Sequence, residues 1–145
     1  MIGIIWVNHH GVLDHLKRAD IVVLYLNVFV LMAVVLIPFA TALMAEHLNS
    51  GDDEQVAAAV YAGSFLLMAI AMGGLWEYIT RRRDQLGVEL SDEEVRSITR
   101  AFHIGNPFYA VAVAVAFISP VAVLVIIAGM ALYYMVSGMR SPDLG

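Results

Sequence analysis

Three long stretches of the chain contain no Asp, Glu, Lys or Arg, and they dominate its pattern of apolar and polar positions. The first runs from Ile21 to Ala45, the second from Gln55 to Trp76 and the third from Ala101 to Met139, with 25, 22 and 39 residues. A membrane-spanning helix needs about 20 predominantly apolar residues. The first two stretches therefore predict one spanning helix each, over about residues 21–45 and 55–78.

The third stretch is too long for one crossing. As a helix it would reach about 58 Å, whereas the hydrocarbon core of a bilayer is about 30 Å thick. Ser119-Pro120 lies near its middle, and proline removes a backbone donor and disfavours helix at the residue before it. We therefore expect two spans, over residues 101–118 and 120–139, with a tight turn at Pro120. Gly105-Asn106-Pro107 should kink or break the first of these spans, and Pro38 should kink the span over residues 21–45.

The N-terminus reads as part of another membrane helix. Seven of the first eight residues are apolar or glycine, and the polar cluster Asn8-His9-His10 ends the run. Its length is about a third of a spanning helix, and it lacks the basic region and the small-residue cleavage site of a signal peptide. We interpret it as the remnant end of a membrane helix, and expect the sequence to start inside that helix.

The distribution of charge along the chain predicts its orientation. The eight basic residues are Lys17, Arg18, Arg81, Arg82, Arg83, Arg96, Arg100 and Arg140. Four spans place all of them on one side, whereas the opposite loop, residues 46–54, carries four acidic residues and no Lys or Arg. By the positive-inside rule, the N-terminal segment, the linker over residues 79–100 and the C-terminus are cytoplasmic.

The linker contains a helix signal of its own. Ser91 precedes Glu94 by three residues, which is the spacing of a capping box, and Val95, Ile98 and Phe102 follow at helical spacing. These features predict a short amphipathic helix that lies at the inner membrane surface and leads into the third span. Its basic residues face either anionic lipid or water.

Composition narrows the class of protein. Hydrophobic residues make up 61% of the chain and charged residues 14%, whereas a soluble domain usually carries about 25% charged residues. The 145 residues predict a single all-α integral membrane domain, 1–145. Cysteine is absent, which excludes disulfides, thiolate metal sites and a cysteine nucleophile. No catalytic constellation, phosphate loop or cofactor ligand pair is apparent, so we expect neither an enzyme nor a cofactor, and no nucleic-acid partner.

Polar residues in or beside the spans are the candidate site residues. The spacing of His9, His10 and His15 does not place three imidazoles on one helix face, so we expect no metal site there. We expect interhelical polar contacts instead, from Asn8, His9, His10, Asn27 and Thr41. The spans carry no acidic or basic residue at mid-depth, which argues against a proton-coupled transporter. Pro38, Pro107 and Pro120 are the expected kinks or turns.

Several pieces of the sequence together resemble the endolysosomal potassium channel family, transmembrane protein 175, in its prokaryotic branch. They are Trp6 with Asn8-His9-His10, Asp20, Leu26-Asn27, Pro38-Phe39-x-Thr41, Tyr61 and the Ser119-Pro120 hairpin. The resemblance covers nearly the whole chain. It implies a subunit with six spans, potassium as the permeant ion and homotetramers assembled around a first helix. In this family that helix carries a Phe-Ser-Asp-Gly-type motif, and bulky apolar side chains on it form the constriction.

No segment of this chain corresponds to that first helix. The resemblance therefore implies an N-terminally truncated potassium-permeable channel subunit, in a prokaryotic plasma membrane, that lacks the first helix and most of the second. We expect such a chain to insert into the bilayer, with conduction absent or poorly selective. The alternative is a non-conducting membrane scaffold that binds partner helices. A small transporter is a third reading, against which the uncharged spans count.

Overall fold

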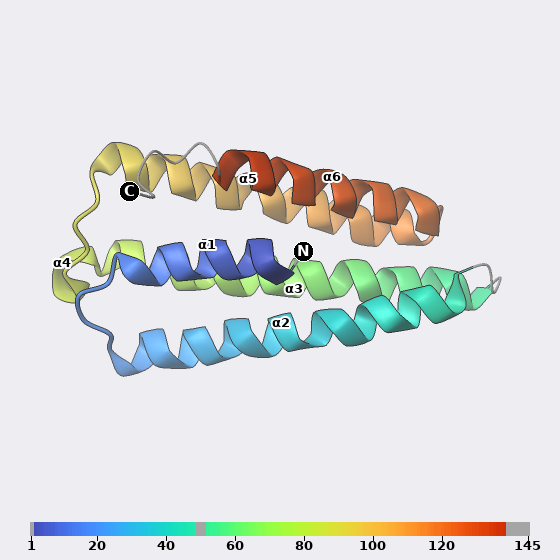
Figure 1. Cartoon of the computed structure of the whole chain (residues 1–145), viewed down its shortest axis with the longest axis horizontal. Coiled ribbons are helices and arrows are strands. Elements are labelled where there is room, and N and C mark those ends of the chain that lie inside the picture. The colour runs from blue at the N-terminus through green and yellow to red at the C-terminus, as the bar shows by residue number, and fades with distance from the viewer. Residues whose placement is uncertain (1, 49–51, 139–145) are drawn as a thin grey trace.

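The structure is a computed structural model of the whole chain, and it describes residues 2–48 and 52–138. Within those residues the secondary structure consists of helices α1 (Ile2–Asp14), α2 (Ile21–His47), α3 (Asp52–Arg81), α4 (Arg83–Leu86), α5 (Asp92–Ala116) and α6 (Pro120–Gly138). The four long helices α2, α3, α5 and α6 run up and down side by side, and α1 lies alongside them (Figure 1). Met139, the expected last residue of the last span, lies outside the described residues. Arg140, the last of the eight basic residues, also lies outside them.

Helix α3 is the centre of the bundle, and it packs against both α2 and α5 (Figure 1). Its buried positions include both alanines and large side chains. Small residues let helix backbones approach closely, while Phe65, Leu75, Trp76 and Ile79 fill the core and are almost completely buried. The indole Nε1 of Trp76 donates a 2.9 Å hydrogen bond to Thr99 Oγ1, which joins α3 to α5.

Helix α2 is apolar on nearly every side. Its buried face is narrow, and its exposed large apolar residues include Leu24, Tyr25, Val28, Phe29, Met32, Val35 and Phe39. Soluble monomers rarely expose apolar surface of this extent. Of the helices in the described part of the chain, α2 and α3 are long and apolar enough to cross a membrane, while residues Pro120–Val136 of α6 form a shorter apolar helix.

Helix α5 differs from the sequence expectation in one respect. The expected break at Gly105-Asn106-Pro107 is wrong, because one helix runs from Asp92 to Ala116 through Pro107, and the amphipathic start is continuous with the expected span. A kink at Pro107 stays a prediction. The expected capping box is present at its start, where Ser91 and Glu94 exchange hydrogen bonds. Proline within a helix removes one backbone hydrogen bond, and burial of α5 on both sides of Pro107 keeps the helix intact.

The hairpin between α5 and α6 is tight. The amides of Ile118 and Ser119 both donate to Val115 O at 2.9 Å, which closes the end of α5. Pro120 is the first residue of α6, a position where its missing N–H costs no helical hydrogen bond. Ser119 Oγ accepts from the amide of Ala122 at 3.3 Å.

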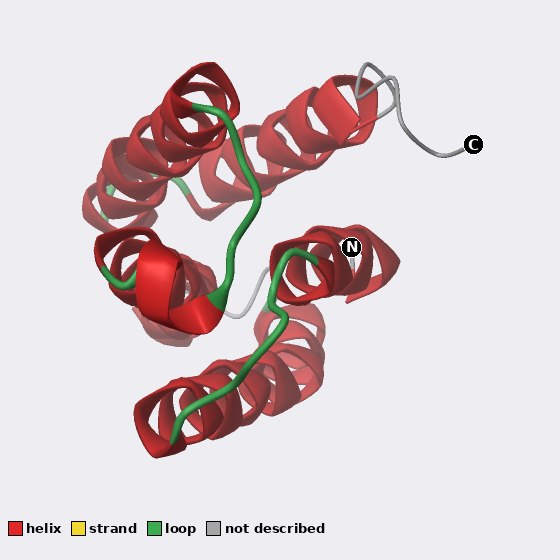
Figure 2. Ribbon diagram, turned by 90° about the vertical axis from the view of Figure 1, so that its left-hand side faces the viewer, coloured by secondary structure: helices red, strands yellow, loops and turns green. Residues whose placement is uncertain are grey.

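The connections at one end of the bundle hold each other in place. Figure 2 looks onto this end, where the α1–α2 and α4–α5 loops cross in front of the helices. The amides of Lys17 and Arg18 donate to Leu86 O at 3.2 and 3.1 Å, which ties the first loop to α4. Gly87 ends α4 with φ +68°, and a Cβ there would lie 3.0 Å from Lys17 Cβ. Both the left-handed backbone and the close approach favour glycine.

Candidate functional site

One polar contact joins α1 directly to α2. His9 Nε2 lies 2.6 Å from Asn27 Oδ1, between side chains that are partly buried. Because a carboxamide oxygen only accepts, this arrangement requires the proton of a neutral His9 ring to sit on Nε2. A paired polar contact between apolar helices fixes their register. The structure thus brings two of the sequence-predicted residues together across a helix interface.

The neighbouring histidine faces the other way. The ring of His10 stacks on Trp6, with centroids 5.0 Å apart and planes 8° apart. His10 Nε2 also lies 3.3 Å from Asp14 Oδ2, and both side chains are exposed. His9 and His10 therefore serve different surfaces of α1, although they are adjacent in sequence. Within the described residues no group of three His or acidic side chains gathers to hold a metal ion.

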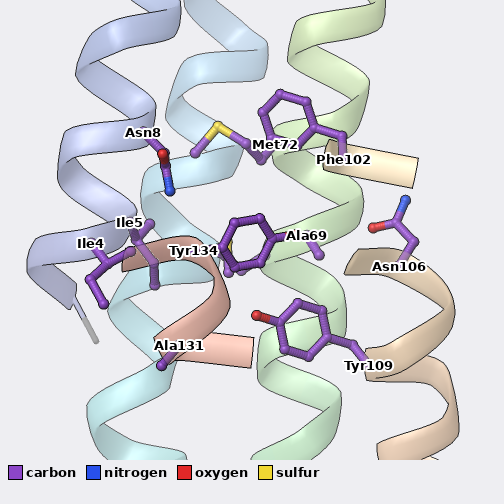
Figure 3. Close-up of a pocket in the computed structure, with 11 residues that line it drawn as sticks. Ile4, Ile5, Asn8, Ala69, Met72, Phe102, Asn106, Tyr109, Ala131 and Tyr134 are labelled. Carbon is purple, nitrogen blue, oxygen red and sulfur yellow. The ribbon is translucent and has the colours of Figure 1, made fainter. Parts of the chain in front are cut away.

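Asn8 lines a cavity of about 50 Å³ between α1, α3, α5 and α6 (Figure 3). Asn106, Tyr109 and Tyr134 line the same cavity. Sequence reasoning did not single out these three residues. The signal for Asn106 was present, since it is a polar residue inside a charge-free stretch, but it was read only as part of a helix-breaking tripeptide.

The remaining predicted residues lie apart from these contacts. Thr41 Oγ1 donates to Ile37 O of its own helix at 2.7 Å. Thr41 lies 14 residues beyond Asn27, which is about 21 Å along α2. Pro38 lies inside the same helix, Pro107 inside α5 and Pro120 at the start of α6. The predicted residues therefore do not form one site.

Asp20 joins the start of α2 to the end of α3. Its Oδ1 accepts from the amide of Val23 at 2.9 Å, and its Oδ2 accepts from the hydroxyl of Tyr78 at 2.6 Å. These two hydrogen bonds hold the pKa of the Asp20 carboxyl below its usual value, with the Tyr78 bond as the larger cause. The guanidinium of Arg82 lies 5.7 Å from the centre of the Tyr78 ring. Asp20, one of the residues that carry the family resemblance, thus caps the start of α2 and links α2 to α3 by a hydrogen bond.

Basic residues gather at this same end of the bundle. Lys17, Arg18, Arg81, Arg82, Arg83, Arg96 and Arg100 lie in the loops that Figure 2 faces or in the helix ends beside them. Several are paired, as Lys17 is with Glu89, Arg81 with Glu77 and Arg83 with Asp92. The hydrogen bond with Arg83 lowers the pKa of the Asp92 carboxyl. Exposed pairs of this kind add little stability.

Comparison with known proteins identifies the family. Residues 1–38, which cover α1 and most of α2, match the sequence model of the endosomal/lysosomal potassium channel TMEM175. Over 134 residues, or 92% of its length, the chain is 37% identical to a potassium channel of Streptomyces collinus. The chain is similar to the TMEM175 family along nearly its whole length. The resemblance seen in its sequence is thereby confirmed.

Two further comparisons extend across the TMEM175 fold. A potassium channel of Chamaesiphon minutus is 40% identical over 116 residues, or 80% of this chain. The crystal structure of a TMEM175 homolog from the same organism, described as a lysosomal potassium-selective channel, covers 93% of this chain at 36% identity with a TM-score of 0.81. This chain spans 65% and 57% of the two relatives and 66% of the chain in that structure.

These relationships explain the apolar surfaces. Lipid covers apolar side chains that water would not tolerate, and helices satisfy their backbone hydrogen bonds internally. The exposed faces of α2 and the charge-free core of α3 suit that environment. The chain is an all-helical integral membrane protein.

Proposed function

We propose that this chain forms part of a subunit of a potassium-permeable cation channel. The observation that carries the proposal is the match of 93% of the chain, with a TM-score of 0.81, to a protein described as a potassium-selective channel. The two curated relatives are also named potassium channels. Similarity to the TMEM175 family thus supports a role in ion transport.

Four membrane crossings, by α2, α3, α5 and α6, are part of this proposal. Helices α2 and α3 have 27 and 30 residues, and each exceeds the length of about 20 residues that a crossing needs. The 25 residues of α5 would reach about 38 Å and the 19 of α6 about 28 Å. The charged first turns of α5 would then lie in the headgroup region, with its apolar remainder in the bilayer.

The charge distribution supports an orientation. Basic side chains gather at the end of the bundle that Figure 2 faces, whereas Glu46, Asp53 and Glu54 lie toward the opposite end. By the positive-inside rule, the basic end faces the cytoplasm. We propose a prokaryotic plasma membrane as the location, with the α1–α2 loop and the C-terminal end of α6 on its inner side.

A homo-oligomer completes the proposal. One chain provides a bundle whose centre is packed with side chains, so an ion path has to run outside that core. We propose a tetramer, by resemblance to prokaryotic members of the family, with the lipid bilayer as the surrounding partner and potassium as the permeant ion. The broad apolar surface of α2 leaves ample area for contacts with lipid or another copy.

Introduced cysteines test the four crossings, because the chain has none of its own. Gln85→Cys lies in α4 and Ile118→Cys in the α5–α6 hairpin, where Ile118 is 81% exposed. A membrane-impermeant thiol reagent should label Gln85→Cys only in inside-out vesicles and Ile118→Cys only in right-side-out vesicles. Glu46→Cys is the matched control for the outer side. Labelling of Gln85→Cys and Ile118→Cys from the same side would contradict four crossings.

Ion flux tests the channel itself. We would reconstitute two proteins in liposomes, namely this chain and a fusion of it to the part of the Streptomyces collinus relative that lies outside the match. Selective potassium flux from the fusion, over sodium, would support the channel, and flux from the chain alone would show that these helices suffice for a pore. Absence of flux from both, despite insertion and assembly, would contradict the channel and favour the non-conducting scaffold.

A further inference from the structure

A groove of about 360 Å³ lies at the basic end of the bundle, where the loop over residues 15–20 connects α1 to α2 (Figure 2). Its apolar wall is formed by Leu13, Leu16, Val23 and Leu24. This volume falls within the range of about 300–1,000 Å³ that is typical of small-molecule sites. Leu24 is 51% exposed, so the groove is open to whatever surrounds the bundle.

Two cationic side chains also line the groove. Lys17 forms an exposed ion pair with Glu89. Arg18 is exposed, and within the described residues its guanidinium has no ion-pair partner. The backbone amide of Arg18 donates to Leu86 O at 3.1 Å. The loop is therefore fixed through its backbone, and the guanidinium remains available to an anion.

Carboxylates do not compete for Arg18 inside the groove, because none of the described residues that line it is acidic. The nearest acidic residues along the chain have other partners. Asp14 lies 3.3 Å from His10 Nε2. Asp20 accepts from the amide of Val23 and from the hydroxyl of Tyr78. The groove therefore combines an apolar wall with unneutralised positive charge.

The groove lies at the depth where a bilayer changes from polar to apolar. Asp20 is the N-cap of α2, and its charge places it in the headgroup layer, which is about 5–8 Å thick on each side of the hydrocarbon core. Asn27 lines the inner end of the groove, and seven residues of helix separate it from Asp20 by about 10 Å. The groove thus extends from the headgroup layer into the outer hydrocarbon.

We propose that this groove binds an anionic phospholipid. The guanidinium of Arg18 holds the headgroup phosphate, for which its fork of N–H donors is well suited, and the start of an acyl chain lies against Leu16 and Leu24. An apolar helix of another chain would fill the same wall but would leave the guanidinium without an anion. The inference goes beyond the proposed channel, because it requires insertion into a bilayer and no ion path.

Native mass spectrometry of the full chain, released from detergent micelles, tests the proposal. The protein is titrated with phosphatidylglycerol or phosphatidylcholine that carry the same acyl chains. One basic residue near an anionic surface changes affinity about fivefold, so we expect one phosphatidylglycerol per chain to bind at least about fivefold more tightly than phosphatidylcholine. Equal affinities would overturn the proposal. Binding of soluble glycerol phosphate as tight as that of phosphatidylglycerol would show a site for a free anion and would also overturn it.

Arg18→Gln removes the proposed phosphate ligand, and should lower the affinity for phosphatidylglycerol about fivefold without changing that for phosphatidylcholine. Arg100→Gln is the matched control. Arg100 is exposed at the same end of the bundle and, within the described residues, has no ion-pair partner and does not line the groove. It should leave both affinities unchanged. Equal losses in the two variants would show a general effect of surface charge and would overturn the site.

Glu89→Gln provides a test that does not require Arg18→Gln to fold. It releases the ammonium of Lys17 from its ion pair, and should tighten the binding of phosphatidylglycerol. Weaker or unchanged binding would overturn the inclusion of Lys17 in the site. Dimers that persist with excess phosphatidylglycerol, and that Arg18→Gln abolishes, would assign the groove to a second copy of the chain and would overturn lipid as its occupant.

Discussion

The contact between Gly105 and Tyr134 leads to a quantitative prediction for Gly105→Ala. A Cβ at this position would lie 2.1 Å from the Tyr134 hydroxyl oxygen and 3.3 Å from its Cζ. The first distance is far inside van der Waals contact, so Tyr134 has to move. Its hydrogen bond to Ala101 O, 3.2 Å long in the structure, is then lost or distorted. The substitution therefore acts on the α5–α6 interface as well as on α5.

Three effects set the magnitude. Loss of the hydrogen bond costs about 0.5–1.5 kcal/mol, and overpacking of a filled interface costs about 1–3 kcal/mol. Alanine gains about 1 kcal/mol over glycine in helix propensity. Steric and hydrogen-bond losses outweigh the propensity gain, so we expect Gly105→Ala to lower the free energy of unfolding by about 2 kcal/mol.

Tyr134→Phe should partly rescue Gly105→Ala. Without the hydroxyl, the nearest remaining atom of the ring is Cζ, at 3.3 Å from the new Cβ, and a shift of a few tenths of an ångström suffices. The double variant should therefore lose less stability than the sum of the two single variants, with a coupling energy of about 1–2 kcal/mol. The assay is unfolding in mixed micelles by titration with a denaturing detergent, followed by the fluorescence of the buried Trp76.

Gly73→Ala is the matched control. Glycine 73 also lies within a helix that faces α5, but its nearest neighbour would be Asn106 Nδ2 at an ordinary 3.8 Å. It should leave stability unchanged or raise it by up to about 1 kcal/mol. The reasoning is refuted if Gly105→Ala is as stable as Gly73→Ala, or if the effects of Gly105→Ala and Tyr134→Phe simply add.

Three other substitutions test the end of the bundle that carries the loops. Hydrogen bonds lower the pKa of Asp20, so its stabilising effect is complete above its unfolded pKa of about 3.9 and disappears as the pH falls through the lower folded value. Asp20→Asn should be less stable than the unmodified chain at neutral pH, and its unfolding midpoint should not show this fall as the pH is lowered. If the unfolding midpoints of the variant and the unmodified chain depended on pH in the same way, the role of the carboxylate would be contradicted. Gly87→Ala should lose about 1–2 kcal/mol, since an L-residue disfavours φ +68°, and Gly87→Asn should lose less; equal midpoints for the two variants would count against backbone strain. Ser91→Ala should cost about 1 kcal/mol through loss of the capping box and speed hydrogen exchange in the first turn of α5, while exchange in α6 serves as the reference; unchanged exchange would show that the cap is dispensable.

Much of the helical architecture follows from one-dimensional features. Asp20 precedes an apolar run, Ser91 and Glu94 have capping-box spacing, and Ser119-Pro120 interrupts a run too long for one crossing. Each is a local rule about backbone donors or helix length, and the structure has helix starts at Ile21, Asp92 and Pro120. Such local rules give the wrong prediction where contacts with other helices determine whether a helix continues. Pro107 disfavours a helix by itself, yet the buried faces of α5 on both sides keep it continuous.

The partners of polar residues are less accessible to sequence reasoning. His9 and Asn27 are each recognisable as polar groups in apolar surroundings, but their pairing depends on how α1 crosses α2. Likewise, Tyr134 and Gly105 are 29 residues apart, and only the hairpin geometry brings the hydroxyl over the glycine. The short helix α4 was also missed, since a four-residue helix ending at Gly87 leaves no periodic pattern.

Several residues that match the family model have large exposed side chains. Helices α1 and α2 carry that match, yet Trp6 is 61% exposed and Tyr25 is 71% exposed. Core packing within this chain therefore does not explain the identity of these side chains. Lipid alone explains apolar character at Tyr25, but not the stacking of Trp6 on His10 beside Asp14. A polar and aromatic cluster of this kind is typical of a protein contact or of the membrane–water interface. Loss of the proposed oligomer in Trp6→Leu, with insertion intact, would assign the cluster to a contact between polypeptides, because leucine preserves apolar area and removes the stacking surface.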